Sequence, residues 1–415
     1  MLAHNHMRLF NRFAIILAAL APLAAHAQYT HTSGENIIAP SGKPLAMRCT
    51  NFGNWMVPEG YMWQISGHIQ SATELETFIT ELIGPDRAHA FWQSWRDTYI
   101  TQDDVHLLHQ AGFNCVRVPF HYKFFQSEDA EGFRLVDRLV QWARAENIQL
   151  ILDMHAAPGG QTGSNIDDSN GFPWLFKDAT AQQQYLSTWQ RIAHHYRNEP
   201  TILGYDLLNE PLPNYPSVSP MNSLLEPLYK RVAAVIRKVD PHHILILEAA
   251  HWDTNFTVFG APFDPNTIYE FHHYGGPTPT LSTIQRYLDF RAKYHIPLWL
   301  GEAGENNDEW IAGFRTLVEQ NNIGWAFWPY KKMGSHSAIE TVTRPADWDA
   351  IVAYTKLPAG VAQHTTNLAQ RPDQAVIDRA IVDLLHNIQL AHCTTNMGYL
   401  HALLPNTTID EHTGH

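Results

Sequence analysis

Two glutamates directly follow apolar runs of this sequence, at points where the chain then turns. The run from Ile202 to Leu208 leads into Asn209-Glu210-Pro211, and the run from Pro297 to Gly301 leads into Glu302. Proline cannot continue a strand ladder, so the first run ends at this point. A pair of carboxyl groups can cleave a glycosidic bond, because one protonates the leaving oxygen while the other attacks the sugar carbon or assists water. The pattern predicts that Glu210 and Glu302 form a catalytic pair.

An arginine lies inside the apolar run Cys115-Val116-Arg117-Val118-Pro119. A charged side chain in a buried strand is costly unless it meets a negative partner. A carboxylate nucleophile is such a partner, and a structural salt bridge within the sheet would account for the same residue. The two interpretations of Arg117 are compatible, because a nearby guanidinium favours the charged form of a carboxylate.

Further polar and aromatic side chains stand where other apolar runs end. In Asp153-Met154-His155, period-two alternation places the acid and the histidine on one face of a strand. A histidine can orient an acid, and a phenol can hydrogen-bond a nucleophile. An indole can form the floor under a sugar ring, although tryptophan more often only packs. The candidates for these roles are His155, His272, His273, Tyr274 and Trp328.

The chain contains 25 histidines, a high number, and a metal site must therefore be considered. The residues that could converge to bind a metal are Asp153, His155, His272 and His273. No His-Glu-x-x-His helix occurs, and no His-x-His follows the first expected strand. The sequence also lacks a Gly-x-Ser-x-Gly elbow, a phosphate-binding loop and a dinucleotide fingerprint after the first strand. We therefore expect no metal and no cofactor, and keep a metal-dependent hydrolase as a rival hypothesis.

Elements that could position these residues alternate along the chain from about residue 46 to residue 350. Short β-rich runs alternate with amphipathic stretches, which is typical of βαβ units with a parallel sheet. Eight successive strands predict an α/β fold, a single (β/α)8 TIM barrel whose site lies at the carboxyl ends of the strands. The expected strands are Ala46–Phe52, Asn114–Pro119, Ile148–Met154, Ile202–Asn209, His243–Glu248, Thr267–Phe271, Pro297–Gly301 and Ile323–Trp328.

Helices and long insertions are expected between the strands. Two insertions rich in Trp, Tyr, Gly and Pro follow the first and third strands, at residues 53–100 and 156–180. Because insertions at strand ends surround barrel sites, we expect these two to wall the substrate cleft, with Trp55 and Trp174 contacting sugar. Apolar residues at helical spacing predict helices over Gln102–Gln110, Phe133–Ala145, Ala181–Tyr196, Asn222–Val239, Ser282–Tyr294, Asp308–Gln320 and Asp373–Leu390.

The first 27 residues have the order of a cleavable secretory signal. Arg8 and Arg12 precede an apolar run, and Ala25-His26-Ala27 supplies the small-residue cleavage site. The apolar run is shorter than the roughly 20 residues that a bilayer-spanning helix needs. We expect a secreted or periplasmic monomer that does not contact the membrane after cleavage, with one catalytic domain over residues 28–360. Residues 361–415 are expected to form a helical extension that packs on the barrel or is partly disordered.

The net charge of the chain indicates which class of molecule it can bind. Removing residues 1–27 leaves 26 basic residues of 28 against 41 acidic ones, so the net charge moves from −13 to −15. Such a charge disfavours nucleic acid and anionic membranes, and a neutral polymer is the better partner.

Three cysteines, Cys49, Cys115 and Cys393, form no Cys-x-x-Cys pair. The first two are expected in the core, and whether one disulfide forms stays open.

Together these motifs resemble glycoside hydrolase family 5, the cellulase-like family, over roughly residues 46–350. The resemblance implies that Glu210 is the acid/base and Glu302 the nucleophile. It also implies an asparagine that contacts the substrate 2-hydroxyl, a histidine and a tyrosine that serve the two acids, and a tryptophan that lines the subsite at the cleaved sugar. The residues at the remaining site positions are Arg117, His155, Asn209, His272, Tyr274 and Trp328.

Within that family, two segments look most like exo-acting β-1,3-glucanases, namely residues 51–59 and 155–161. This resemblance implies that Glu59 binds the terminal glucose. The sequence departs from the subgroup at Asn54, Pro58, Gly60, Gly160 and Asp167-Asp168-Ser169. We expect a retaining enzyme that cleaves β-glucosidic bonds of a β-glucan or oligosaccharide, acting like an exo-β-1,3-glucanase or β-glucosidase. Endo-β-1,4-glucanase or mannanase action is the alternative, and a non-catalytic carbohydrate-binding barrel is the rival from another class.

Overall fold

The computed structural model describes residues 29–65, 67, 69–164, 167–169, 171–356 and 368–409. The expected signal segment, residues 1–27, lies outside the described residues, as do residues 361–367 and 410–415 of the expected extension. Among the described residues, no helix is both long enough and apolar enough to cross a bilayer.

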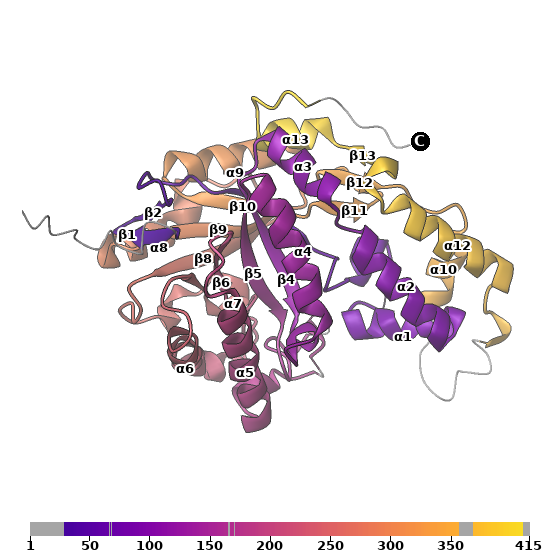
Figure 1. Ribbon diagram of the computed structural model, residues 1–415, viewed down its shortest axis with the longest axis horizontal. Coiled ribbons are helices and arrows are strands. Elements are labelled where there is room, and N and C mark those ends of the chain that lie inside the picture. Colours follow the sequence, from indigo (N-terminus) through magenta and orange to yellow (C-terminus); the bar gives the residue numbers. More distant parts are fainter. Residues whose placement is uncertain are drawn as a thin grey trace, which may run out of the picture.

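Eight parallel strands close into a barrel in chain order, and the last strand pairs back with the first. The predicted TIM barrel and each of its expected strands are confirmed, with ends that move by a few residues. Helices follow the strands and cover the outside of the barrel (Figure 1). The barrel strands are β3 (Arg48–Asn51), β4 (Cys115–His121), β5 (Gln149–Ala156), β6 (Ile202–Asp206), β7 (Ile244–Glu248), β8 (Thr267–Tyr274), β9 (Leu298–Gly304) and β10 (Gly324–Trp328).

The helices expected around the barrel are confirmed, and their ends have clear local causes. Asp178 caps α5 by accepting a hydrogen bond from the Ala181 N–H, and Asn307 caps α9 through the Trp310 N–H, each over 2.9 Å. These helices are α3 (Gln102–Ala111), α4 (Glu131–Ala145), α5 (Ala179–Tyr196), α6 (Leu225–Arg237), α8 (Leu281–Tyr294) and α9 (Asp308–Gln320). Short helical segments in the loops are η3 (Tyr122–Phe125), η5 (Trp174–Phe176), η6 (Ser219–Leu224), α7 (Ala250–Asp253) and η7 (Phe256–Val258).

The insertion after β3 is largely helical, which the sequence did not lead us to expect. It contains η2 (Gly60–Trp63), α1 (Ala72–Ile83) and α2 (Pro85–Thr98). Trp63 packs on Trp92 and Trp95 with ring centroids 5.7 and 4.5 Å apart, and all three side chains are buried. Most tryptophans of this insertion therefore build a small core of their own and do not wall the cleft.

The insertion after β5 is fixed by the two aspartates at which the sequence departs from its nearest subgroup. Asp167 accepts hydrogen bonds from the backbone N–H groups of Gln161 and Thr162, over 2.8 and 2.7 Å. Asp168 hydrogen-bonds His121 Nε2 over 2.7 Å and accepts from the Thr73 hydroxyl over 2.7 Å. The loop is thereby tied to the end of β4 and to the start of α1.

The described residues after the barrel fold back onto it. In a small sheet, β12 (Glu340–Val342) pairs with β11 (Lys331–Met333) and with β13 (Cys393–Thr395). The predicted helix near Asp373–Leu390 is confirmed as α12 (Gln374–Asn387), which contacts α1, α2 and α10 (Trp348–Thr355). The 3-10 segment η9 (Leu390–His392) follows, and α13 (Met397–Leu403) packs on α9. The domain boundaries themselves stay a prediction.

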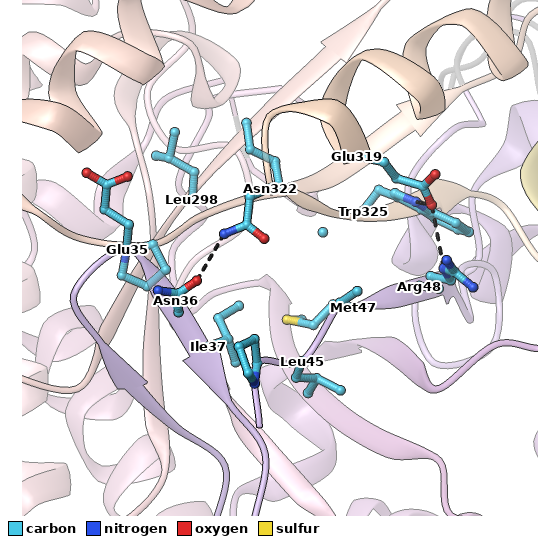
Figure 2. Close-up of a pocket in the computed structure, with 15 residues that line it drawn as sticks. Glu35, Asn36, Ile37, Leu45, Met47, Arg48, Leu298, Glu319, Asn322 and Trp325 are labelled. Atoms are coloured by element: carbon cyan, nitrogen blue, oxygen red, sulfur yellow. Dashed lines mark hydrogen bonds and ion pairs between the residues drawn. The ribbon is translucent and has the colours of Figure 1, made fainter. Parts of the chain in front are cut away.

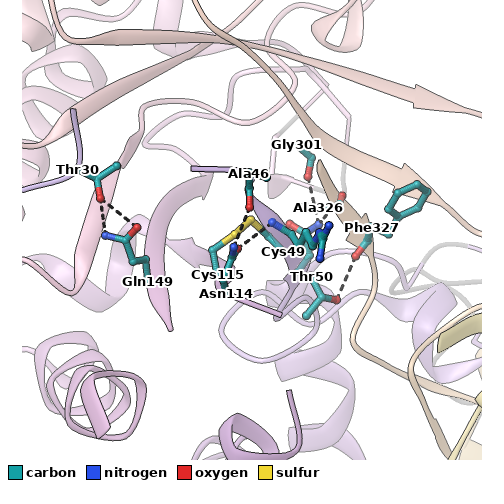
Figure 3. Close-up of a disulfide and its surroundings, with 12 residues drawn as sticks. Thr30, Ala46, Cys49, Thr50, Asn114, Cys115, Gln149, Gly301, Ala326 and Phe327 are labelled. Atoms are coloured by element: carbon teal, nitrogen blue, oxygen red, sulfur yellow. Dashed lines mark hydrogen bonds between the residues drawn. A yellow bond between two sulfur atoms is a disulfide. The ribbon is translucent and has the colours of Figure 1, made fainter. Parts of the chain in front are cut away.

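At the amino ends of the strands the barrel interior is apolar. We call this set of buried side chains the apolar layer: Met47, Cys49, Cys115, Ile151, Leu203, Ile244, Ile246, Ile268, Trp299 and Ala326. Cys49 and Cys115 are opposite each other in β3 and β4 and form a disulfide with Cα atoms 4.5 Å apart (Figure 3). This settles the question that the cysteine count left open, and Cys393 is a buried free thiol.

A hairpin of β1 (His31–Ser33) and β2 (Asn36–Ile38) lies beside this amino end. Between the hairpin and the first residues of β3, β9 and β10 is a cavity of about 210 Å³ (Figure 2). Asn322 Nδ2 donates to Asn36 Oδ1 over 3.1 Å across it, and Arg48 pairs with Glu319 at 3.5 Å. Barrel enzymes use the amino end for stability and the opposite end for chemistry.

Candidate active site

Glu210 lies just past the end of β6, in a left-handed backbone conformation with a φ of 43°. Residues other than glycine rarely adopt this conformation, and those that do are concentrated at functional sites. Its backbone N–H donates to Glu248 Oε2, at the end of β7, over 2.6 Å. The neighbouring strand thus holds the turn, and the Glu210 side chain faces the cavity at the carboxyl ends of the strands.

Glu302 lies within β9, and both of its carboxyl oxygens have a donor. Arg117 Nη1 donates to Oε1 over 2.5 Å, and the Tyr274 hydroxyl donates to Oε2 over 2.8 Å. Arg117 comes from β4 and Tyr274 from the last position of β8. The structure therefore brings these two expected partners to the carboxylate that the sequence singled out.

His272 connects the two glutamates. Its Nδ1 atom is 2.9 Å from Glu210 Oε1 and 3.9 Å from Glu302 Oε2. One side-chain ligand atom from each of these three residues lies within 4.8 Å of the others. Two carboxyl groups that are far apart in sequence thus face the same small space.

Arg117 is the centre of a buried group of charges beneath this pair. Its guanidinium contacts Asp153, Asp206 and Glu248 at 2.8 to 3.1 Å, and Glu270 at 3.7 Å. We call Arg117 and these four acids the ionic layer, and all five residues are fully buried. Asn209 joins it, since its Oδ1 accepts from Arg117 Nη2 over 2.9 Å and its backbone carbonyl accepts from Gln161 Nε2 over 3.0 Å.

Burial dominates the protonation of these groups. It raises the pKa of all four acids of the ionic layer, with Arg117 opposing the shift, because water no longer solvates the charged form. Burial also raises the pKa of Glu210. It lowers the pKa of His155 to about 4 and that of His272 to about 3, so both imidazoles are neutral at pH 7.

The space between the glutamates is a cavity of about 420 Å³. Trp328 forms part of its wall, stacks with His155 at a centroid distance of 5.6 Å, and donates its indole N–H to the Tyr61 hydroxyl over 2.8 Å. Glu59 is buried at the cavity, and its Oε1 atom has no hydrogen-bond partner among the described residues. The lining residues are Glu59, Tyr61, His155, Glu210, Tyr274, Gly275, Glu302, Gly304, Glu305 and Trp328.

Three residues expected to contact substrate do not line this cavity. Trp55 is a correction: its side chain is buried in the interior and its indole N–H donates to the Arg96 carbonyl over 2.8 Å. Trp174 is 48% exposed and packs on Phe172 in the loop after β5. His273 points to the other side of β8 from His272 and stacks on Trp310 at 6.1 Å.

Other residues of the site were not predicted. Glu248 and Glu270 each stand two positions past an inward-facing isoleucine, Glu248 in a strand that is otherwise apolar and Glu270 between Tyr269 and Phe271. A charge inside an apolar run is the signal that pointed to Arg117, and it could have found both acids. Tyr61, in the short segment η2, and Glu305, just after β9, also line the cavity, and no such periodic signal exists at either position.

Three donor groups of the described residues are compact enough to be considered for a metal ion: Glu210 with His272 and Glu302, Glu248 with Asp253 and His272, and Asp153 with Asp206 and Glu248. Arg117 already binds all three acids of the last group. In the first group Glu302 is occupied by Arg117 and Tyr274. The rival set of Asp153, His155, His272 and His273 does not converge, because His273 faces away. Arg117 compensates the negative charge of these acids, and we therefore assign no metal ion to the site.

A (β/α)8 barrel with two facing glutamates at the carboxyl ends of its strands defines a class, the barrel glycoside hydrolases. Residues 73–334 match the family model described as cellulase, glycosyl hydrolase family 5. The chain therefore belongs to glycosyl hydrolase family 5 and is a glycoside hydrolase.

The names of the relatives point to different sugar substrates. A beta-xylosidase of Phanerodontia chrysosporium is 27% identical, over 74% of this chain and 71% of its own length. Endoglucanase C of Acetivibrio thermocellus is 25% identical, over 57% and 85%. A probable glucan 1,3-beta-glucosidase A of Aspergillus fumigatus is 28% identical over 55% of each chain, so this chain matches about half of that protein. Among solved structures, a rutinosidase from Aspergillus niger shares the fold, with a TM-score of 0.57 and 16% identity over 71% of this chain and 92% of its own.

Proposed function

We propose that this chain is a retaining β-glycosidase in which Glu302 is the nucleophile and Glu210 the acid and base. The observation that carries the proposal is that side-chain oxygens of the two residues lie within 4.8 Å of each other. Retaining enzymes hold their carboxyl groups about 5 Å apart, whereas inverting enzymes leave roughly 6.5–9.5 Å for a water molecule.

In the first step the Glu302 carboxylate attacks the anomeric carbon, while Glu210 gives its proton to the leaving oxygen. Arg117 and Tyr274 hold the attacking carboxylate in place. Burial raises the pKa of Glu210, which suits a group that must carry a proton near neutral pH. In the second step Glu210 takes a proton from water, whose oxygen attacks the same carbon and frees Glu302.

We further propose that the substrate is a β-glucan or β-gluco-oligosaccharide, attacked from its non-reducing end at β-1,3 or related bonds. Glu59 supports this assignment, because it lines the cavity and one oxygen of its buried carboxyl group has no hydrogen-bond partner in the part of the chain that the structure describes. A buried oxygen of this kind is suited to accept from a sugar hydroxyl. His155, stacked on Trp328, and Asn209 are assigned to binding of the same sugar.

Stereochemistry and substitution test the mechanism. NMR of the first product from a β-glucoside should show the β-anomer, and an α-anomer would exclude retention.

Glu302→Gln and Glu210→Gln should each lower kcat on an unactivated β-glucan by about 10²–10⁴-fold or more. Glu226→Gln, on α6 outside the barrel, is the matched control and should keep full activity. Near-full activity of either site variant would refute the assignment.

A panel of linkage-defined β-glucans, mannan and aryl β-xylosides tests the substrate. Glucose as the first product supports exo action, whereas a ladder of oligosaccharides would favour the endo-β-1,4-glucanase or mannanase alternative. Tight glucan binding without reducing sugar would favour a binding barrel. Activity that is lost with a chelator and restored by a metal would favour the metal-dependent rival.

We also propose that residues 1–27 are a cleaved secretory signal, as the order of charged, apolar and small residues indicates. Amino-terminal sequencing of the protein from periplasm or medium should begin near Gln28. A mature protein that still starts at Met1 would contradict this.

A further inference from the structure

His272 is hydrogen-bonded on both sides by carboxyl groups. Its Nδ1 atom is 2.9 Å from Glu210 Oε1, and its Nε2 atom is 3.0 Å from Glu270 Oε1. Glu210 faces the cavity, whereas Glu270 is fully buried in the ionic layer. A neutral imidazole has one N–H and one lone pair, so the protonation of the two carboxyl groups decides which nitrogen carries the hydrogen.

The barrel makes room for Glu270 at this position. A Cβ atom on Gly301, in the adjacent strand β9, would lie only 1.3 Å from Glu270 Oε1. Any other residue at position 301 would force the Glu270 side chain away from His272. The contact between Glu270 and His272 therefore depends on the glycine that directly precedes Glu302.

The surroundings of Glu270 contain far more acid than base. The titratable groups that face this pair are Arg117 of β4, Asp153 and His155 of β5, Asp206 of β6, Glu210 after β6, Glu248 of β7, Asp253 after β7 and Glu302 of β9. Arg117 is the one fixed cation in this set, and its Nε atom bonds Asp206 at 2.8 Å in preference to Glu270 at 3.7 Å. Burial raises the pKa of Glu270 well above its usual range.

The hydrogen bonding around Glu270 also suits a neutral acid. Its Oε2 atom has no hydrogen-bond partner among the described residues. A buried carboxylate with an unsatisfied oxygen is costly, whereas a carboxylic acid can donate its hydrogen through one oxygen and leave the other as a weak acceptor. A carboxylic acid kept neutral at pH 7 by burial, so that it can donate, is a known device in enzymes.

We propose that Glu270 is a positioning residue that stays protonated and donates its O–H to His272 Nε2, so that the His272 Nδ1–H donates to Glu210. Glu210 Oε1 then accepts this hydrogen bond in both chemical steps, and the proton for the leaving group belongs on Oε2. An ionised Glu270 would bind the Nε2–H and turn the Nδ1 lone pair towards Glu210, which repels the carboxylate left after proton transfer. This inference rests on the acid/base role proposed for Glu210.

The test measures the tautomer of His272 in the full-length enzyme labelled with ¹⁵N-histidine. Its NMR signals are assigned by their absence from His272→Gln. In the unmodified enzyme we expect a protonated Nδ1 and an unprotonated Nε2 throughout the pH range of activity. Glu270→Gln should keep this tautomer and keep kcat within about threefold, because its amide N–H replaces the O–H.

Glu270→Met removes the donor while filling similar space. We expect it to lower kcat about tenfold with little change in KM, and to abolish the fixed tautomer. Glu340→Gln, which alters a buried carboxyl group on β12 outside the barrel, is the control for general effects of such a substitution. It should leave the His272 signals and kcat unchanged.

A hydrogen on Nε2 in the unmodified enzyme would overturn the inference, and so would Glu270→Met with an unchanged tautomer and kcat. If Glu270→Met fails to fold, the spectrum of the unmodified enzyme still decides. A fully active Glu210→Gln would instead refute the proposed function, and that outcome is distinguishable because the NMR result does not depend on turnover.

Discussion

The two ends of the barrel interior carry opposite chemistry on the same strands. In β7 the inward residue Ile246 belongs to the apolar layer, and Glu248, the next inward residue, belongs to the ionic layer. Ile268 and Glu270 repeat this change in β8. Inward positions recur every second residue, so the change takes place over about 6.6 Å of strand. One short strand therefore supplies stability with its earlier inward residues and chemistry with the last one or two.

The difference implies two kinds of stability. The apolar layer is held by burial, which changes little with pH and tolerates small losses of volume. The ionic layer is held by one guanidinium and by retained protons, so loss of one partner leaves the others uncompensated. Substitutions at equivalent inward positions should therefore separate the two layers, both in the size of their effects and in the property that they change.

Arg117→Met should have the largest effect. Removing the cation that contacts all four acids of the ionic layer and Glu302 should lower the free energy of unfolding by about 3–5 kcal/mol and remove activity. Urea unfolding and a reducing-sugar assay measure the two losses. Arg117→Lys, which keeps a charge but not the planar fork, should recover part of the stability and little of the activity. An active, stable Arg117→Met would contradict the view that one cation organises this layer.

The disulfide of the apolar layer comes next. Replacing Cys49 and Cys115 together by alanine opens a link between residues 66 positions apart and should cost about 2–4 kcal/mol of stability. Activity of the folded protein should be kept, because the bridge lies at the end of the barrel remote from the glutamates. Cys393→Ala is the control for removing a buried sulfur. A large fall in kcat at temperatures where the variant is folded would show that the two layers are coupled.

The pH dependence of stability should distinguish the layers further. A carboxyl group with a higher pKa when folded binds more protons in the folded state, so it stabilises the fold below about pH 4 and this contribution is lost as pH rises towards neutral. Burial raises the pKa of Asp206 in this way. The contribution of Asp206 should therefore decline from pH 4 towards 7, whereas His155 and His272, whose pKa burial lowers, contribute in the opposite direction. Asp206→Asn should make the change in stability from pH 4 to 7 more favourable than in the unmodified enzyme by on the order of 1–3 kcal/mol. Urea unfolding at four pH values measures it, and an unchanged slope would refute it.

The sequence was informative where function depends on position along one strand. The barrel strands and the placement of Glu210 and Glu302 at strand ends could be predicted, because apolar runs that end in a single acid are local patterns. The catalytic roles of the two glutamates stay a prediction. The role of Glu270 depends on Gly301 in the neighbouring strand and on His272 two residues further along. Such a relation across strands requires the register, which composition and periodicity do not provide.

Aromatic residues in loops were the least predictable. The position of Trp55 and Trp174 in insertions that follow strand ends suggested sugar contact, but the partners of each side chain decide. Trp55 lies in an insertion whose helices were not expected, although α1 carries clear local signals. Ser71 and Glu74 form a capping box at its start, and its buried apolar residues recur at helical spacing, so this helix could have been found in the sequence. Trp328 could be predicted because it ends a barrel strand, where side chains face the site.

Ile246→Val should have the smallest effect and is the sharpest test of the comparison. It removes one methylene from the apolar layer, two residues before Glu248, and should cost about 0.5–1.5 kcal/mol of stability. Because the β7 backbone stays in place, the bond from the Glu210 N–H to Glu248 should persist, and the pH profile of kcat/KM should match that of the unmodified enzyme. Glu248→Gln is the matched substitution one inward step further, with little change in volume, and should alter that profile. If Ile246→Val shifts the profile as much as Glu248→Gln, the layers act as one unit and the division between stability and chemistry along β7 is wrong.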